Sequence, residues 1–191
     1  MKKLQRAALA AASAAVVAAA GLGIASATAS AQPAAASHAS QSAAAAGQVG
    51  KVAANERVVE RFLRTVIDEH HGSAAGGLLT ANASWHGGTV GVVSGRANVQ
   101  GLFTGIVTAL PNLHGTTYDI LGQGDQVVVR QILTGTQKEA ILGIPASGKT
   151  VTWNALDLFV LRDGKISQIW AGDDWTAILA DTGTYKAPWI K

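Results

Sequence analysis

The sequence predicts a single α+β domain in which helices come first and a curved antiparallel sheet follows. Two observations predict this order: apolar residues recur at helical spacing in the first half of the chain, and the apolar pattern changes to a period of two after Pro111. The chain has 191 residues, of which 48% are hydrophobic and 14% are charged. A chain of this length has room for one such domain.

The first 31 residues are predicted to form a signal peptide. A short cationic head that ends at Arg6 precedes an uncharged run over residues 7–24, and small residues follow up to Ala31. We expect cleavage after Ala31; a cut after Ala27 fits a similar pattern, and an uncleaved anchor is the alternative. Because alanine adds little to membrane insertion, we expect a secreted or extracytoplasmic protein with no stable membrane insertion after cleavage.

The net charge of +3 comes from this cationic head. The chain contains 15 Lys and Arg against 12 Asp and Glu, and without the three cations of the head the two signs balance. A neutral body lacks the clustered cations that phosphate contacts need, so nucleic acid is not an expected partner. The chain also has no cysteine, which excludes disulfides and thiol-linked lipids.

Residues 32–50 are predicted to be a flexible spacer between the signal and the domain. They are rich in Ala, Ser, Gln and Gly and contain almost no large apolar side chain. Such a segment buries too little surface to offset the entropy lost on ordering. We expect the domain itself to cover residues 51–185, with residues 186–191 as a tail.

Two long helices are expected at the start of the domain. The first runs from Lys51 to about residue 71, with Gly72 as a plausible C-cap, and Ser73 is a candidate cap for a shorter helix that reaches Thr80. The second covers residues 97–110 and stops before Pro111. The apolar face of the first helix comprises Val58, Val59, Phe62, Leu63, Val66 and Ile67.

Four strands are expected after these helices, followed by a last helix that begins near Trp175. Alternation places the strands at residues 116–123, 125–137, 150–161 and 165–172. Gly124 and the pair Asp163-Gly164 form the tight connections, and Asp-Gly between two alternating runs is a strong hairpin signal. Helices followed by such a run of strands indicate one sheet that wraps around the helices.

Two adjacent carboxylates are the first candidates for chemistry. Asp173 and Asp174 follow the last strand and are flanked by Trp170 and Trp175. We expect at least one of the two carboxylates to lie beside indole surface, where desolvation raises its pKa toward the range useful for proton transfer near neutrality. The alternative is that the acidic pair caps the helix that begins near Trp175.

Other candidate residues are less specific. His86 follows Trp85 and precedes two glycines, so it lies either at a pocket mouth or in a solvated loop. Trp153, Trp170 and Trp175 are either core residues or a platform for a ligand. The five histidines lack the spacing of a metal site, and we expect no bound metal.

Several short motifs occur in the order and spacing of a known family. They are Leu133-Thr134-Gly135-Thr136, the run from Gly143 to Lys149, Asp163-Gly164-Lys165-Ile166, and Trp170 followed by Asp174. Over residues 52–185 the chain resembles the SnoaL-like polyketide cyclases, also called ester cyclases. The resemblance implies the cone-shaped fold of the nuclear transport factor 2 superfamily, with a deep hydrophobic pocket between helices and sheet. Relatives with this fold often form homodimers through the open sheet face, so the resemblance allows a homodimer here.

The resemblance also implies an activity. In these cyclases a pocket aspartate, which maps onto Asp174, performs an intramolecular aldol condensation on an apolar carbonyl compound without metal or cofactor. His86 is the candidate helper. Ketosteroid-isomerase-like proton transfer or dehydration would use similar machinery, and the residues do not separate these reactions. The expected ligand pocket comprises Trp153, Trp170, Gln137 and Gln168.

Two glutamines favour a second hypothesis, a non-catalytic module that binds a small apolar ligand. Gln137 stands where the family has a histidine, and Gln168 stands where it commonly has an acid. A glutamine side chain forms hydrogen bonds but does not shuttle a proton. The retained Trp170-x-x-x-Asp174 spacing instead favours the enzyme.

Overall fold

The structure of the protein is a computed structural model that describes residues 33–189. The predicted signal peptide and its cleavage site lie outside the described residues. The helical elements are α1 (Pro33–Phe62), η1 (Leu63–Asp68), η2 (Gly72–Ala74), α2 (Ala75–Leu78), η3 (Gly88–Val90), α3 (Arg96–Ala109) and α4 (Trp175–Thr182). The strands are β1 (Leu79–His86), β2 (Val92–Ser94), β3 (His114–Gln123), β4 (Gln126–Thr136), β5 (Thr150–Arg162) and β6 (Lys165–Trp170).

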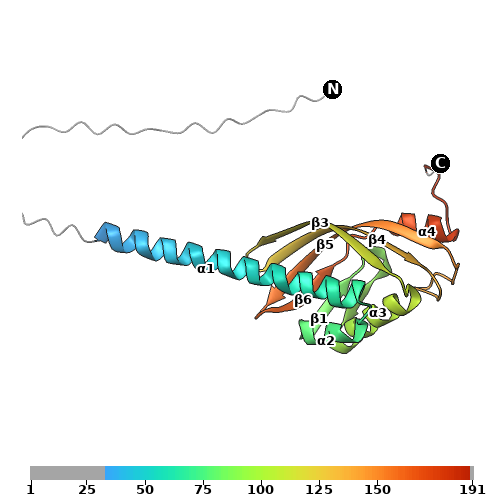
Figure 1. Cartoon of the computed structure of the whole chain (residues 1–191), viewed down its shortest axis with the longest axis horizontal. Coiled ribbons are helices and arrows are strands. Elements are labelled where there is room, and N and C mark those ends of the chain that lie inside the picture. Colours follow the sequence, from blue (N-terminus) through green and yellow to red (C-terminus); the bar gives the residue numbers. More distant parts are fainter. Residues whose placement is uncertain (1–32, 190–191) are drawn as a thin grey trace, which may run out of the picture.

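The six strands form one curved sheet, in the order β2-β1-β6-β5-β4-β3. The end of α1, together with α2 and α3, packs on the inner face of this sheet (Figure 1). Strands β3 to β6 pair as an antiparallel meander, close to the predicted bounds. The predicted α+β class, with the amino-terminal helices packed in a curved sheet, is therefore confirmed.

Residues 33–50 of the expected flexible spacer are instead part of a helix. α1 begins at Pro33 and extends well beyond the sheet, and residues 41–50 are exposed along its length (Figure 1). Alanine has the highest intrinsic helix propensity. The packed turns after Lys51 supply the costly nucleus, which the alanine-rich segment then extends even though residues 41–50 are exposed. The helix propensity of alanine therefore outweighs the lack of large apolar side chains in residues 33–50.

The predicted apolar face of the first helix is confirmed. Val59, Phe62 and Val66 are at most 1% exposed, whereas Glu60 and Arg64 face solvent. The Phe62 ring lies 4.9 Å from that of Phe103 and 5.9 Å from that of Phe159, both in edge-to-face geometry. Phe62 thus joins α1 to α3 and to β5 at the centre of the core.

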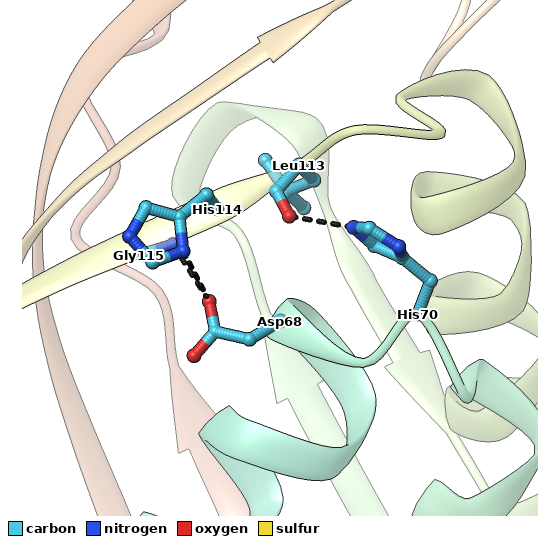
Figure 2. A network of polar contacts seen from close by, with 5 residues as sticks. All are labelled: Asp68, His70, Leu113, His114 and Gly115. Atoms are coloured by element: carbon cyan, nitrogen blue, oxygen red, sulfur yellow. Dashed lines mark hydrogen bonds and ion pairs between the residues drawn. The ribbon is translucent and has the colours of Figure 1, made fainter.

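The helical run that begins with α1 ends at a network of polar contacts with the start of β3 (Figure 2). Asp68 Oδ1 accepts a hydrogen bond from the Gly115 backbone N–H at 2.9 Å and lies 3.0 Å from His114 Nδ1. The His70 side chain donates through Nε2 to the Leu113 carbonyl oxygen at 2.6 Å. These contacts fix the end of the helical run against the edge strand of the sheet.

Gly72 does not have the predicted role of C-cap. His70 adopts the left-handed conformation that ends the helix, with φ 57°. Gly72 serves close packing instead, because an added Cβ would lie 2.5 Å from the Thr104 Cα atom of α3. The sequence pattern located the end of the helix but assigned the wrong reason for the glycine.

β1 was not predicted from the sequence. The short helix expected to reach Thr80 ends at Leu78, and β1 follows directly. β1 pairs in parallel with β6, and its register shifts between Leu79 and Ser84. This irregularity interrupts the period of two, so the alternation that marks the other strands is weak here. In residues 33–189, no helix is long and apolar enough to cross a membrane.

A candidate acid and base site

A small, mostly apolar cavity of about 60 Å³ lies between the helices and the inner face of the sheet. Aromatic side chains from three directions line it, among them Phe62 of α1, Phe103 of α3 and Trp153 of β5. Its polar lining comes from three side chains, which are Gln131, Asp157 and Asp173. The cavity therefore brings two carboxyl groups together in apolar surroundings.

Asp157 enters the cavity because of the alternation of β5. Its side chain points to the same face of the sheet as those of Trp153, Ala155 and Phe159, because the four residues alternate along the strand. Asp157 is 8% exposed. Oδ1 accepts a hydrogen bond from the Gly172 backbone N–H at 3.0 Å, and Oδ2 lies 3.5 Å from Gln131 Nε2. Burial and the nearby charge of Asp173 raise the pKa of Asp157 to about 7.

Gly172 permits this arrangement. A Cβ on Gly172 would overlap the Leu156 carbonyl oxygen, so only glycine lets the chain after β6 pass so close to β5. The Leu156 N–H donates to the Gly172 carbonyl oxygen at 3.2 Å, which holds the two segments together. This contact aims the Gly172 N–H at Asp157.

Asp173 lies on the segment between β6 and α4 and reaches the same cavity. Its Oδ1 accepts a hydrogen bond of 2.6 Å from the Trp153 indole Nε1. Burial raises the pKa of Asp173 to about 6, and the indole hydrogen bond opposes this rise because it stabilises the charged form. The indole N–H favours the charged form of Asp173, so Asp173 is the member of the pair suited to act as base while Asp157 holds a proton.

Asp174 does not face the cavity. Its side chain is exposed, and Oδ1 accepts a hydrogen bond of 3.1 Å from the Ala177 backbone N–H, so Asp174 is the N-cap of α4. The expected position of the acid/base group beside indole surface is occupied by its neighbour Asp173. The two neighbouring aspartates therefore have different roles. At the start of α4 the Asp174 side chain turns toward the helix, and the Asp173 side chain turns toward the core.

His86 and two of the expected pocket residues lie on the outer face of the sheet. His86 stacks on Trp170 with ring centroids 3.9 Å apart, and its Nε2 lies 2.9 Å from Ser84 Oγ. The Gln168 side chain accepts a hydrogen bond from the Trp170 indole. This cluster is separated from Asp173 by the sheet itself, so the structure does not support His86 as a helper of the cavity carboxylates.

Gln137 is completely buried, but it does not line the cavity. Its Nε2 donates to the carbonyl oxygens of Ile144 and Pro145, and its Oε1 accepts from the backbone and hydroxyl of Ser147. Gln137 therefore holds the connection between β4 and β5. Of the six residues expected at the site, only Trp153 lines the cavity.

Asp157 and Gln131 were missed, although the sequence contains a signal for both. Each occupies an inward position of an otherwise apolar alternation, Gln131 after Val129 and Asp157 before Phe159. A polar residue at a core position of a strand is unusual and points to a buried polar contact or a site. In the described residues, no group of three or more acidic or histidine side chains is arranged to hold a metal ion.

Comparisons with known proteins assign the chain to a family. The profile of the SnoaL-like polyketide cyclases matches residues 57–182, which include the helices, the sheet and both cavity carboxylates. Among curated proteins, none matches the chain.

Solved structures support the same fold. A protein from Jannaschia sp. CCS1 assigned as a SnoaL-like polyketide cyclase is 23% identical, with a TM-score of 0.63 over 71% of this chain and 95% of that chain. TsrD from Streptomyces laurentii is 25% identical, with a TM-score of 0.61 over 70% of this chain and 97% of that chain. An LEH-like epoxide hydrolase from M. tuberculosis is 13% identical, with a TM-score of 0.57 over 70% of this chain and 92% of that chain. The fold is that of the nuclear transport factor 2 and ketosteroid isomerase-like proteins, and the chain belongs to the SnoaL-like polyketide cyclase family.

Proposed function

We propose that the protein catalyses acid/base chemistry on an apolar carbonyl compound, an intramolecular aldol-type cyclisation, with Asp173 as base and Asp157 as acid. One observation carries this proposal: two carboxyl groups, both with a pKa raised by burial and only one of them bound to an indole N–H, face the same apolar cavity. Pairs of titratable groups whose surroundings separate their pKa values are the usual basis for assigning an acid and a base.

The reaction follows from these two groups. The Asp173 carboxylate removes a proton from the carbon next to a carbonyl, while the Asp157 carboxyl group hydrogen-bonds the carbonyl oxygen as it gains negative charge. The enolate carbon then attacks a second carbonyl carbon of the same molecule and forms a carbon–carbon bond. The new alkoxide takes a proton from the acid form of the pair. The Trp153 indole keeps Asp173 oriented throughout.

Three Asp→Asn variants test the proposal, because asparagine keeps the shape and removes proton exchange. Polycyclic ketones and β-keto esters that carry a second carbonyl group placed for ring closure are screened with the wild type, Asp173→Asn, Asp157→Asn and the matched control Asp174→Asn. Turnover is followed by absorbance and ligand binding by tryptophan fluorescence. We expect Asp173→Asn and Asp157→Asn to lower turnover at least about 100-fold, the usual contribution of a general acid or base. Asp174→Asn should change it little.

Two outcomes would contradict the proposal. Undiminished turnover in Asp173→Asn would remove this aspartate from the mechanism. Binding of apolar ligands without turnover of any of them would favour the non-catalytic binding module, for which the apolar lining of the cavity is equally suitable.

We also propose that the protein is exported. The cationic head, the uncharged run and the small residues up to Ala31 support this proposal. An exported enzyme would meet its substrate outside the cytoplasm, so the substrate would itself be released from the cell or encountered there.

A further inference from the structure

The cavity that holds the two carboxylates is too small for a ring-shaped compound. Its volume is about 60 Å³, whereas a cavity known to bind benzene measures roughly 150 Å³. Part of the wall must therefore move before any cyclic substrate can reach Asp157 and Asp173. Most of the wall consists of strands and helices that pack into one core, and these elements are poor candidates for movement.

One part of the wall is a turn. The connection between β4 and β5 places Ile141 and Leu142 against the cavity. Ile141 and Ile144 exchange backbone hydrogen bonds of 2.8 and 3.0 Å, and Leu142 and Gly143 form the tip between them. Leu142 lines the cavity while 36% of its surface is exposed, so its side chain stands between the cavity and solvent.

The backbone of this turn is unusual for its sequence. Leu142 has φ 48° and Gly143 has φ 84°, which is the pattern of a turn that asparagine and glycine favour. A bulky side chain in the left-handed region is an outlier that costs conformational energy. Such strain persists only where the surroundings hold it, and it is typical of ligand clamps and switch regions.

The Gln137 side chain holds this strained turn in place. Its buried amide binds Ile144, Pro145 and Ser147 on the carboxyl side of the turn. On the other side, the Lys138 N–H donates to the Ala109 carbonyl oxygen of α3 at 2.8 Å. The chain is therefore anchored on both sides of the turn. The Leu142 side chain at the tip, in contrast, has one side open to solvent.

We infer that Leu142 is the residue that determines which substrates enter: its side chain closes the cavity, and the length of this side chain sets the size of the carbonyl compound that reaches Asp157 and Asp173. The inference rests on the proposed function for the identity of the substrate, but not for the closure. Gln137 acts as a positioning residue, because it fixes the turn that presents Leu142.

Two variants test the inference against a matched control. Leu142→Ala shortens the side chain. Leu142→Asn also replaces the apolar side chain by a shorter one, and asparagine tolerates the left-handed backbone at this position. Leu121→Ala removes the same atoms from a leucine on β3 that is 67% exposed and does not line the cavity. The first measurement is quenching of tryptophan fluorescence by acrylamide, made in a background in which the exposed Trp170 and Trp189 are both replaced by Phe. The remaining indoles, those of Trp85, Trp153 and Trp175, all line the cavity, so the signal reports access to the cavity without any substrate.

The second measurement compares the Kd values of cyclohexanone and progesterone, a small and a large neutral ketone. For both Leu142 variants we expect severalfold faster quenching and a shift of at least about ten-fold in the ratio of Kd values toward the larger ketone. Leu142→Asn should in addition melt at the same or a higher temperature than the wild type, so that easier access is not a sign of general loosening. Leu121→Ala should behave as the wild type in both measurements.

The outcomes separate this inference from the proposed function. Wild-type quenching in both Leu142 variants would overturn the inference, whether or not a ketone binds. Faster quenching in these variants would support closure by Leu142 even if no ketone binds any variant, a result that counts against the proposed function alone. An unchanged ratio of Kd values, with binding of both ketones, would overturn the assignment of Leu142 as the size-determining residue.

Discussion

The Trp153 indole N–H donates a hydrogen bond of 2.6 Å to Asp173 Oδ1 inside the cavity. This contact joins the middle of the sheet to the segment that enters α4, and it favours the charged form of Asp173. The other cavity carboxyl group, Asp157, has no indole partner, and its contacts are with Gly172 and Gln131. The two carboxyl groups differ because their hydrogen-bond donors and their burial differ.

Trp153→Phe should raise the pKa of Asp173 further above its ordinary value. The phenyl ring keeps most of the apolar contact but has no N–H to stabilise the carboxylate, so desolvation acts without opposition. We expect the acidic limb of the pH–rate profile to move to higher pH. Trp189→Phe is the control, because Trp189 is 75% exposed and does not line the cavity. A profile identical to that of the wild type would show that the hydrogen bond has no effect on Asp173.

Asp157→Asn should make the protein more stable at high pH. The pKa of Asp157 is raised from 3.8 to about 7, so between these values the folded state binds the proton more tightly than the unfolded state. The contribution of Asp157 to stability is therefore largest at low pH and is lost as the pH rises toward 7. Relative to the wild type, we expect the free energy of unfolding of Asp157→Asn to be higher at pH 8 than at pH 4 by about 2–4 kcal/mol.

Urea denaturation at both pH values measures this difference. Asp163→Asn is the matched control, since Asp163 is exposed and its positive φ suits asparagine. A difference between wild type and Asp157→Asn that does not change with pH would contradict the raised pKa.

Asp174→Ala should cost about 0.5–2 kcal/mol of stability, the usual cost of losing an N-cap. Asp174→Asn should cost little, because asparagine caps a helix as well as aspartate does. Neither change should lower turnover of a compound that Asp173 processes, since the Asp174 side chain is exposed and bound to Ala177. Thermal melts and initial rates on the same samples decide between a capping and a catalytic role.

Phe62→Ala should destabilise the fold by about 3–5 kcal/mol, the usual range for truncation of a buried phenylalanine. Phe62 is 1% exposed and contacts two other phenylalanine rings. Glu60→Ala, on the exposed face of the same helix, should change stability by less than roughly 0.5 kcal/mol. Equal effects in denaturant would mean that the helix does not pack through this face.

Export predicts a mature chain that begins at Gln32. Amino-terminal sequencing of material from the medium or the extracytoplasmic compartment identifies the first residue. A chain that still begins at Met1 and sediments with membranes would contradict both cleavage and release.

The sequence by itself determined the class of the fold, because periodicity and turn residues are local properties. The alternation of β4 and β5, the Asp163-Gly164 turn and the apolar face around Phe62 depend on near neighbours in the chain, and the structure agrees with them. The spacing of the motifs in the second half of the chain was sufficient to indicate the family.

Only the tertiary structure decided which residues share the cavity. Asp157 and Asp173 are 16 positions apart and approach each other because β5 and the segment after β6 are joined at Gly172. His86 and Trp170 are on the other side of the same sheet, and no local pattern states which face of a strand the helices will cover. Likewise, the sequence alone does not distinguish Asp173 from Asp174, because they are adjacent residues of the same type. The start of α4 distinguishes them, because the N-cap side chain must turn back to the helix and its neighbour is left to face the core.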